Sequence, residues 1–257
     1  MTIQYKNFIY NEERKFIFAY VPKVACTNWK SLMRYMAGYD DWLDNKLAHD
    51  KVNGGLRYLD FGNPSDYALL KDPGIKKYTM VRDPYSRVLS AYLNKIENRL
   101  PPQAETDDED HFRKVVRDID GFRIDKLGSE AYPEITLEVF LLWLQAGESW
   151  FTKDEHWAPQ STLLQQPEIE FDYVGRFETL PEDAPLILHA MGCSKDFPTQ
   201  NEVNFAPTDA NSKVSLYFMP ETVALVDEIF ANDFRLFRFQ RNVSLGGVEI
   251  SRSISDA

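Results

Sequence analysis

At two points in this sequence a short apolar segment runs through a polar turn directly into a helical pattern. Residues 15–21, KFIFAYV, are rich in aromatic and β-branched side chains and stop at a proline, which predicts a buried strand. Asn28 then opens a series of apolar residues at helical spacing that ends at Gly38. Residues 77–81, KYTMV, predict a second strand, and Pro84 stands where the first turn of a helix tolerates proline. The chain therefore contains two strand–turn–helix segments.

Strand and helix patterns continue to alternate downstream. The further predicted elements are helices at residues 136–145, 181–191 and 221–230 and a strand at residues 171–177. Such alternation is typical of an α/β fold with a central, mainly parallel sheet flanked by helices. The aromatic residues 234–239 are expected to close this sheet or to pack on it. Ligands of such sheets bind beyond the C-terminal ends of the strands, which directs attention to turns 22–28 and 82–87.

Composition limits the class of protein. Acidic residues outnumber basic ones by 40 to 29, a net charge of −11, which disfavours a general nucleic-acid binder because that function needs a basic face. The apolar runs at residues 16–21 and 139–144 are far shorter than the roughly 20 residues of a membrane-spanning helix. Residues 1–10 have no apolar core of a secretory signal. We therefore predict a cytoplasmic protein with no transmembrane segment.

The cysteine count and the chain length set further limits. The two cysteines, Cys26 and Cys193, are too few for a disulfide scaffold and form no CxxC zinc motif. A single domain over residues 1–257 is expected, with a polar, frayed tail from about residue 243. The acidic residues 105–110 predict either the solvated start of a surface helix or a cover over an active site.

Both strand–turn–helix segments carry groups that bind anions. In VPKVACTNWK, residues 21–30, Lys23 and Thr27 stand before or at a helix N-terminus, whose unpaired N–H groups attract phosphate or sulfate. This turn contains no glycine, so it is not the GxxxxGK[ST] loop of nucleotide triphosphatases. In VRDPYSRVLSAYLNK, residues 81–95, Arg82 and Ser90 supply a fork and a hydroxyl for a second phosphate. The alternative is a capped helix with a lysine and a surface Arg–Asp pair.

Taken together, the two motifs resemble those of sulfotransferases that use 3′-phosphoadenosine 5′-phosphosulfate (PAPS). More narrowly, they look like the Golgi carbohydrate sulfotransferases of the chondroitin 4-O and HNK-1 type. The resemblance extends to EHWAPQ (155–160), DYVGRFETLPEDA (172–184) and DFRLFRF (233–239). It implies a P-loop-like sulfotransferase fold and an enzyme that transfers a sulfuryl group from PAPS to an acceptor hydroxyl, without a metal.

The resemblance also implies roles for individual residues. Its cofactor-binding set is Lys23, Cys26, Thr27 and Asn28 for the 5′-phosphosulfate and Arg82 and Ser90 for the 3′-phosphate. Lys23 would stabilise charge on the leaving phosphate, and Cys26 would pack rather than act as a nucleophile. Trp29 is as easily a core residue as an adenine-stacking one. His49, between the two motifs, is the expected general base, and His156 is a second candidate that would also orient the acceptor. The sequence gives less support for a general base at Glu155, and His111 and His189 are expected to be structural.

The acceptor is expected to be a carbohydrate. Because a charge of −11 suits a strongly anionic polysaccharide poorly, a neutral or lightly charged sugar is favoured. A small alcohol or a lipid head group remains an alternative acceptor. A kinase-like, nucleotide-dependent enzyme and a glycan-binding protein without turnover are the rival function classes.

Overall fold

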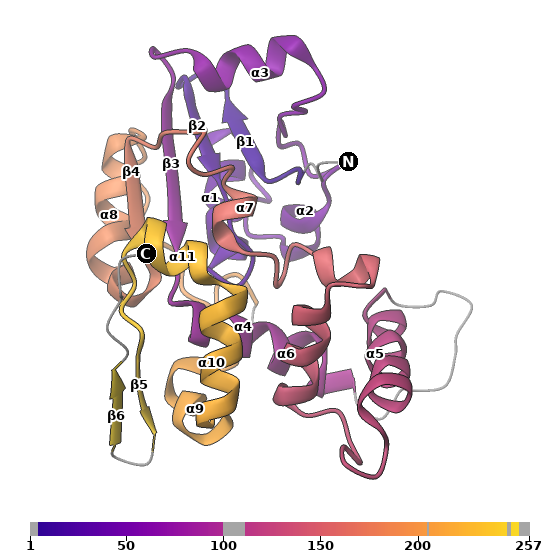
Figure 1. The fold of residues 1–257 in the computed structure, drawn as a ribbon. Helices are drawn as coiled ribbons and strands as arrows, with labels where there is room; N and C mark the ends of the chain where they lie inside the picture. Colours follow the sequence, from indigo (N-terminus) through magenta and orange to yellow (C-terminus); the bar gives the residue numbers. More distant parts are fainter. Residues whose placement is uncertain (1–4, 100–110, 205, 246–247, 252–257) are drawn as a thin grey trace. The chain divides into compact units, whose positions relative to one another are not determined.

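The computed structural model describes residues 5–99, 111–204, 206–245 and 248–251 (Figure 1). The acidic segment 105–110 lies outside the described residues. The chain divides into two compact units. The sheet unit comprises Met1–Arg82 and Gln160–Pro207, and the helical unit comprises Asp83–Pro159 and Thr208–Ala257.

The sheet unit is built on four strands in the order β1-β2-β3-β4 (Figure 1). These strands are β1 (Phe8–Asn11), β2 (Phe16–Ala19), β3 (Lys76–Val81) and β4 (Tyr173–Arg176). β2, β3 and β4 run parallel, with Phe18 paired to Tyr78 and Tyr78 paired to Tyr173, whereas β1 is antiparallel to β2. The predicted mainly parallel sheet is thus confirmed. The edge strand β1 adds a hairpin that the sequence analysis did not anticipate.

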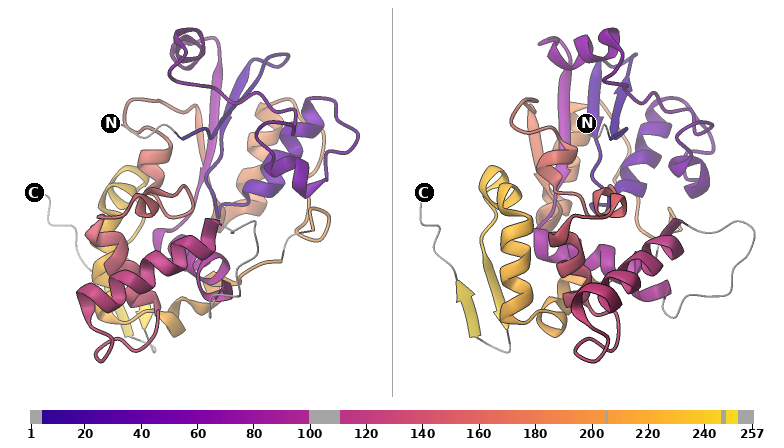
Figure 2. Two further views of the ribbon diagram at one scale, coloured as in Figure 1. Left: turned by 90° about the vertical axis from the view of Figure 1, so that its right-hand side faces the viewer. Right: turned by 45° about the vertical axis from the view of Figure 1, so that its right-hand side comes forward.

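Helices flank this sheet, as expected. α1 (Cys26–Met36) and α8 (Leu180–Ala190) cover one of its faces (Figure 2). Trp29 is fully buried on α1, its ring 4.5 Å from that of Phe18 and 4.9 Å from that of Phe197, so it is a core residue. The remaining helices of the unit are short: α2 (Asn45–His49), α3 (Pro64–Lys71), α7 (Gln160–Leu163) and the 3₁₀ turn η4 (Phe177–Thr179).

The helical unit packs its own apolar core. Its elements are α4 (Pro84–Lys95), η1 (Glu97–Arg99), α5 (His111–Phe122), the π-helical turn η2 (Arg123–Leu127), α6 (Leu137–Ala146), η3 (Trp150–Lys153), α9 (Ala210–Tyr217), α10 (Pro220–Ile229) and α11 (Ala231–Phe237). α6 packs on α10 and α4 packs on α9. The hydroxyl of Tyr85 donates to Asp227, and burial together with this carboxylate raises the pKa of Tyr85 far above its usual value.

The C-terminal part of the chain forms a helix and a hairpin. The aromatic residues 234–239 lie mostly in helix α11, so they add no strand to the four-stranded sheet. The region expected to be a polar tail contains an antiparallel hairpin, β5 (Asn242–Leu245) with β6 (Val248–Ser251). None of the described helices is both long and apolar enough to cross a membrane.

Candidate active site

The turn between β2 and α1 has an unusual backbone. Lys23 and Ala25 both adopt left-handed conformations, with φ of 69° and 50°. Alternating left-handed residues of this kind turn successive N–H groups into a concave nest that binds anions. A non-glycine residue costs about 1 kcal/mol in this region, and the fold accepts that cost twice within three residues. The turn therefore has the backbone of an anion cradle although it contains no glycine.

The start of α1 reinforces that cradle. Ala25 occupies the N-cap position and has no polar side chain to bond the first N–H groups, and the first turn carries no acidic residue. Those N–H groups and the positive end of the helix dipole together attract an anion. Lys23 as a residue is only 9% exposed, which places a cation beside the turn at a largely buried position.

Arg82 joins the β3 turn to the β2 turn. Its Nη1 donates to the carbonyl oxygen of Lys23 at 2.9 Å, and its guanidinium stacks 4.3 Å from the ring of Phe177. Arg82 is 5% exposed, although its side chain carries a permanent charge. The two turns singled out in the sequence thus lie side by side at the C-terminal ends of neighbouring parallel strands.

Gln160 fixes this junction, and the sequence analysis missed it. Its Oε1 accepts from the backbone N–H of Arg82 at 2.9 Å, and its Nε2 donates to the carbonyl of Arg82 at 2.7 Å. The residue is fully buried. A side-chain amide that satisfies both main-chain groups of one residue substitutes for a strand neighbour at the end of β3.

The structure brings His49 to the β2 turn. His49 is the last residue of α2, a short helix whose N-cap Asp44 accepts from the N–H groups of Lys46 and Leu47. Nε2 of His49 lies 2.9 Å from Oγ1 of Thr27, which is itself 3% exposed. The imidazole is solvent-exposed, so a base at this position remains within reach of a substrate.

Asn28 and Cys26 occupy the same turn with different environments. The side-chain amide of Asn28 donates to the carbonyl of Pro198 at 2.7 Å, which ties α1 to the segment after α8. This bond gives Asn28 a structural task in addition to its predicted cofactor contact. Cys26 is a free thiol of intermediate exposure at the first position of α1.

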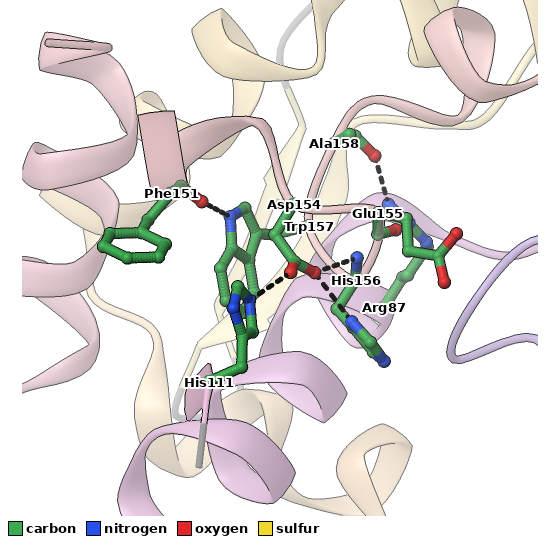
Figure 3. Close-up of polar contacts among 8 residues, drawn as sticks. All are labelled: Arg87, His111, Phe151, Asp154, Glu155, His156, Trp157 and Ala158. Atoms are coloured by element: carbon green, nitrogen blue, oxygen red, sulfur yellow. Dashed lines mark hydrogen bonds and ion pairs between the residues drawn. The ribbon is translucent and has the colours of Figure 1, made fainter. Parts of the chain in front are cut away.

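Ser90 belongs to the helical unit. It lies on α4, where its hydroxyl is 2.9 Å from that of Thr208. Arg87, on the same helix, donates to the carbonyls of Ala158 at 2.9 Å and Glu155 at 3.1 Å (Figure 3). Because Arg82 and Ser90 belong to different units, their joint grip on one phosphate stays a prediction.

His156 sits in a polar cluster within the helical unit (Figure 3). Oδ1 of Asp154 accepts from Nδ1 of His156 at 2.7 Å and from its backbone N–H at 2.9 Å. Oδ2 of the same carboxylate accepts from Nε2 of His111 at 2.8 Å. Burial would raise the pKa of Asp154, but the bonds from the two imidazoles lower it to about 2. His111, expected to be only structural, thus contacts the same carboxylate as the predicted acceptor-binding histidine.

The described residues contain no set of three His, Cys, Asp or Glu side chains arranged to hold a metal ion. In the His111–Asp154–His156 cluster the carboxylate lies between the two imidazoles, so it forms a hydrogen-bonded chain. The prediction that the reaction needs no metal stays a prediction.

Comparison with known proteins identifies the family. A family model described as "Sulfotransferase family" matches residues 6–240, which include both turns and most of both units. The chain belongs to the sulfotransferase family. The resemblance drawn from the two turn motifs is therefore confirmed. No solved structure gives a significant match.

Several curated relatives belong to one branch of this family. Carbohydrate sulfotransferase 11 of Rattus norvegicus is 27% identical over 249 residues, covering 91% of this chain and 67% of the relative. Carbohydrate sulfotransferase 14 of Homo sapiens is 31% identical over 183 residues, covering 71% of this chain and 46% of the relative. Carbohydrate sulfotransferase 9 of Homo sapiens is 27% identical over 248 residues, covering 90% and 53%. The chain spans about half to two thirds of these proteins.

Proposed function

We propose that this chain transfers the sulfuryl group of PAPS to a hydroxyl of a carbohydrate. One observation carries the proposal: the guanidinium of Arg82 contacts the carbonyl of Lys23, so a lysine-bearing and an arginine-bearing turn meet at one edge of the sheet. Family membership supplies the reaction class, and the names of the relatives supply the acceptor class.

The residues present suit an adenosine donor that carries two separate anionic groups. The nest at Lys23 and Ala25, the uncapped start of α1 and the Thr27 hydroxyl all favour the 5′-phosphosulfate. Arg82, and by the family resemblance Ser90, suit the 3′-phosphate because a guanidinium offers a planar fork to phosphate oxygens. Asn28 and Cys26 complete the predicted set at the first turn of α1. We further propose that both units belong to a single sulfotransferase domain.

Each side chain has a defined task in the proposed reaction. Bound PAPS supplies an activated sulfuryl group. His49 accepts the proton of the acceptor hydroxyl, for which it must lie within hydrogen-bond reach of that oxygen. Lys23 offsets the negative charge that grows on the leaving phosphate, as cations do in phosphoryl transfer. The bond between His49 and Thr27 links the proposed base to the turn that binds the donor.

The acceptor we favour is a neutral or lightly charged sugar. A protein with a net charge of −11 repels a strongly anionic polysaccharide unless a local basic cleft compensates. A small alcohol or a lipid head group is the alternative acceptor. The cytoplasmic location expected from the sequence stays a prediction.

A donor-and-acceptor screen tests the function. We expect the full chain to release 3′-phosphoadenosine 5′-phosphate from ³⁵S-labelled PAPS and to label at least one member of a panel of neutral and charged oligosaccharides. Thermal stabilisation by 3′-phosphoadenosine 5′-phosphate but not by ATP separates this reaction from a kinase-like one. Stabilisation by ATP alone, with no label transferred to any acceptor, would overturn the proposal.

Replacement of Arg82 by lysine tests the proposed 3′-phosphate site. Lysine keeps the charge but loses the fork, so we expect 3′-phosphoadenosine 5′-phosphate to bind about 10- to 100-fold more weakly. Binding of adenosine 5′-monophosphate, which lacks the 3′-phosphate, should hardly change. Titration calorimetry with both nucleotides measures the ratio. Arg57→Lys, at a half-exposed arginine of the same unit, is the matched control. Equal losses for both nucleotides would show that Arg82 acts only on the fold.

A further inference from the structure

Several side-chain hydrogen bonds hold the loop that carries His156 in place. Arg87, itself 1% exposed, bonds the carbonyls of Glu155 and Ala158, and the indole N–H of Trp157 donates to the carbonyl of Phe151 at 2.9 Å. Figure 3 shows the bond from Arg87 to Ala158 and the bond from Trp157 to Phe151 on either side of the residues that carry His156. A side chain fixed in this way has little freedom to lose when a ligand binds.

The hydrogen-bond pattern determines which nitrogen of His156 carries the proton. An ionised carboxylate can only accept, so Nδ1 of His156 donates to Asp154. Burial lowers the pKa of His156, against the opposing bond and charge of Asp154, which favours the neutral ring. In a neutral imidazole whose Nδ1 is protonated, Nε2 carries the lone pair.

That lone pair is available to a ligand. Nε2 of His156 has no hydrogen-bond partner among the described residues and points away from Asp154 (Figure 3). The side chain is 22% exposed, so the ring is largely desolvated while one edge remains reachable. A reachable acceptor atom on a largely buried ring can take a hydrogen bond from a ligand hydroxyl.

The charged groups around the His156 ring favour an uncharged hydrogen-bond donor as its ligand. Lys95 opposes protonation of His156, and Glu155 favours it. The ring centroid of Phe112 lies 5.1 Å from that of the imidazole, so Phe112 shields one side of it. The ammonium of Lys95 lies 4.3 Å from the centroid of the same Phe112 ring. His111 bonds the second oxygen of Asp154 and so leaves the first to His156. The arrangement suits a hydroxyl rather than a charged group.

We propose that Asp154 and His111 are positioning residues, which hold His156 so that its Nε2 accepts a hydrogen bond from a hydroxyl of the carbohydrate acceptor. The inference rests on the proposed function and extends it, because within this cluster the family resemblance gave a role to His156 but none to Asp154 or His111.

Asp154→Asn provides the main test. An asparagine amide both donates and accepts, so it no longer enforces the tautomer with a proton on Nδ1. We expect the KM for the acceptor to rise by about tenfold or more, with the dissociation constant for 3′-phosphoadenosine 5′-phosphate unchanged. His111→Phe, at an exposed position, should also raise the acceptor KM, but by less than Asp154→Asn does.

Asp118→Asn is the matched control. Asp118 also accepts from an aromatic ring N–H in the helical unit, that of Trp143 at 2.8 Å, but does not contact His156. It should lower stability without changing the acceptor KM. If Asp154→Asn fails to bind 3′-phosphoadenosine 5′-phosphate, His111→Phe takes its place as the deciding variant.

A spectroscopic measurement supports the kinetics independently of turnover. Two-bond ¹⁵N–¹H correlation of the histidine rings should show His156 protonated on Nδ1 in the wild type and altered in Asp154→Asn. An Nε2-protonated ring in the wild type, or a folded Asp154→Asn with an unchanged acceptor KM, would overturn the inference while leaving the proposed function intact. A wild-type protein that sulfates no acceptor would instead overturn the proposed function and this inference with it.

Discussion

Lys23→Ala should lower kcat by about 10²- to 10³-fold, the loss typical of removing one preorganised group that stabilises transition-state charge. The reason is the setting of this residue, which is 9% exposed and belongs to a turn shaped for an anion. In such a setting water replaces the lost ammonium poorly. Initial rates with labelled PAPS at saturating acceptor measure the effect.

Lys71→Ala is the appropriate comparison for Lys23→Ala. Lys71 belongs to the same unit and donates to the carbonyl of Glu168, but it is exposed on α3. Its loss should leave kcat within about twofold of the wild type, as for most surface substitutions. Normal turnover by Lys23→Ala would show that Lys23 takes no part in the reaction. The contact between the two turns would then have no catalytic role.

His49→Ala should reduce kcat by about 10²- to 10⁴-fold, the usual contribution of a positioned general base. Affinity for 3′-phosphoadenosine 5′-phosphate should persist, because the nest and the helix N-terminus do not depend on the imidazole. Single-turnover rates and calorimetry on the same preparation separate the two effects.

The control for His49→Ala lies in the same unit. His189→Ala removes an exposed histidine from α8 and should leave turnover unchanged. Normal turnover by His49→Ala would refute the base assignment without affecting family membership. His156 would then be the histidine to test as the base.

The parts of the fold that follow from local composition were predictable. The three parallel strands coincide with aromatic and β-branched runs, and most long helices coincide with apolar spacing. For the aromatic residues 234–239 the option of closing the sheet is wrong, because Phe234 and Phe237 satisfy helical spacing as well as a strand-like pattern. The four-residue strand β1 has too short a pattern to stand out, and its pairing with β2 and its bridge to Tyr58 define it.

The candidate site divides in a similar way. Both turns were found because each combines a strand end, a helix start and a cation within a few residues. Their partners are distant in sequence: Gln160 bonds Arg82, and Pro198 accepts from Asn28. Nothing in the local sequence of a glutamine or a proline carbonyl indicates such a contact. The bond between Asp154 and His111 could not be predicted for the same reason, because His111 lies on a helix distant in sequence from Asp154.

The double hydrogen bond between Gln160 and Arg82 also joins the point where the chain leaves the sheet unit to the point where it returns. Residues 83–159 thus form a long insertion into the sheet unit, and hydrogen bonds between the flanking residues Arg82 and Gln160 hold its two ends together. The entropic free-energy cost of closing a loop grows only slowly with its length, by roughly 0.6 kcal/mol for each doubling. Changes of length in loops of this segment that follow α4 should therefore cost the sheet unit little free energy of folding. Such loops are the natural place to re-engineer acceptor choice, because the turn that carries Arg82 and the helix that carries Ser90 precede them.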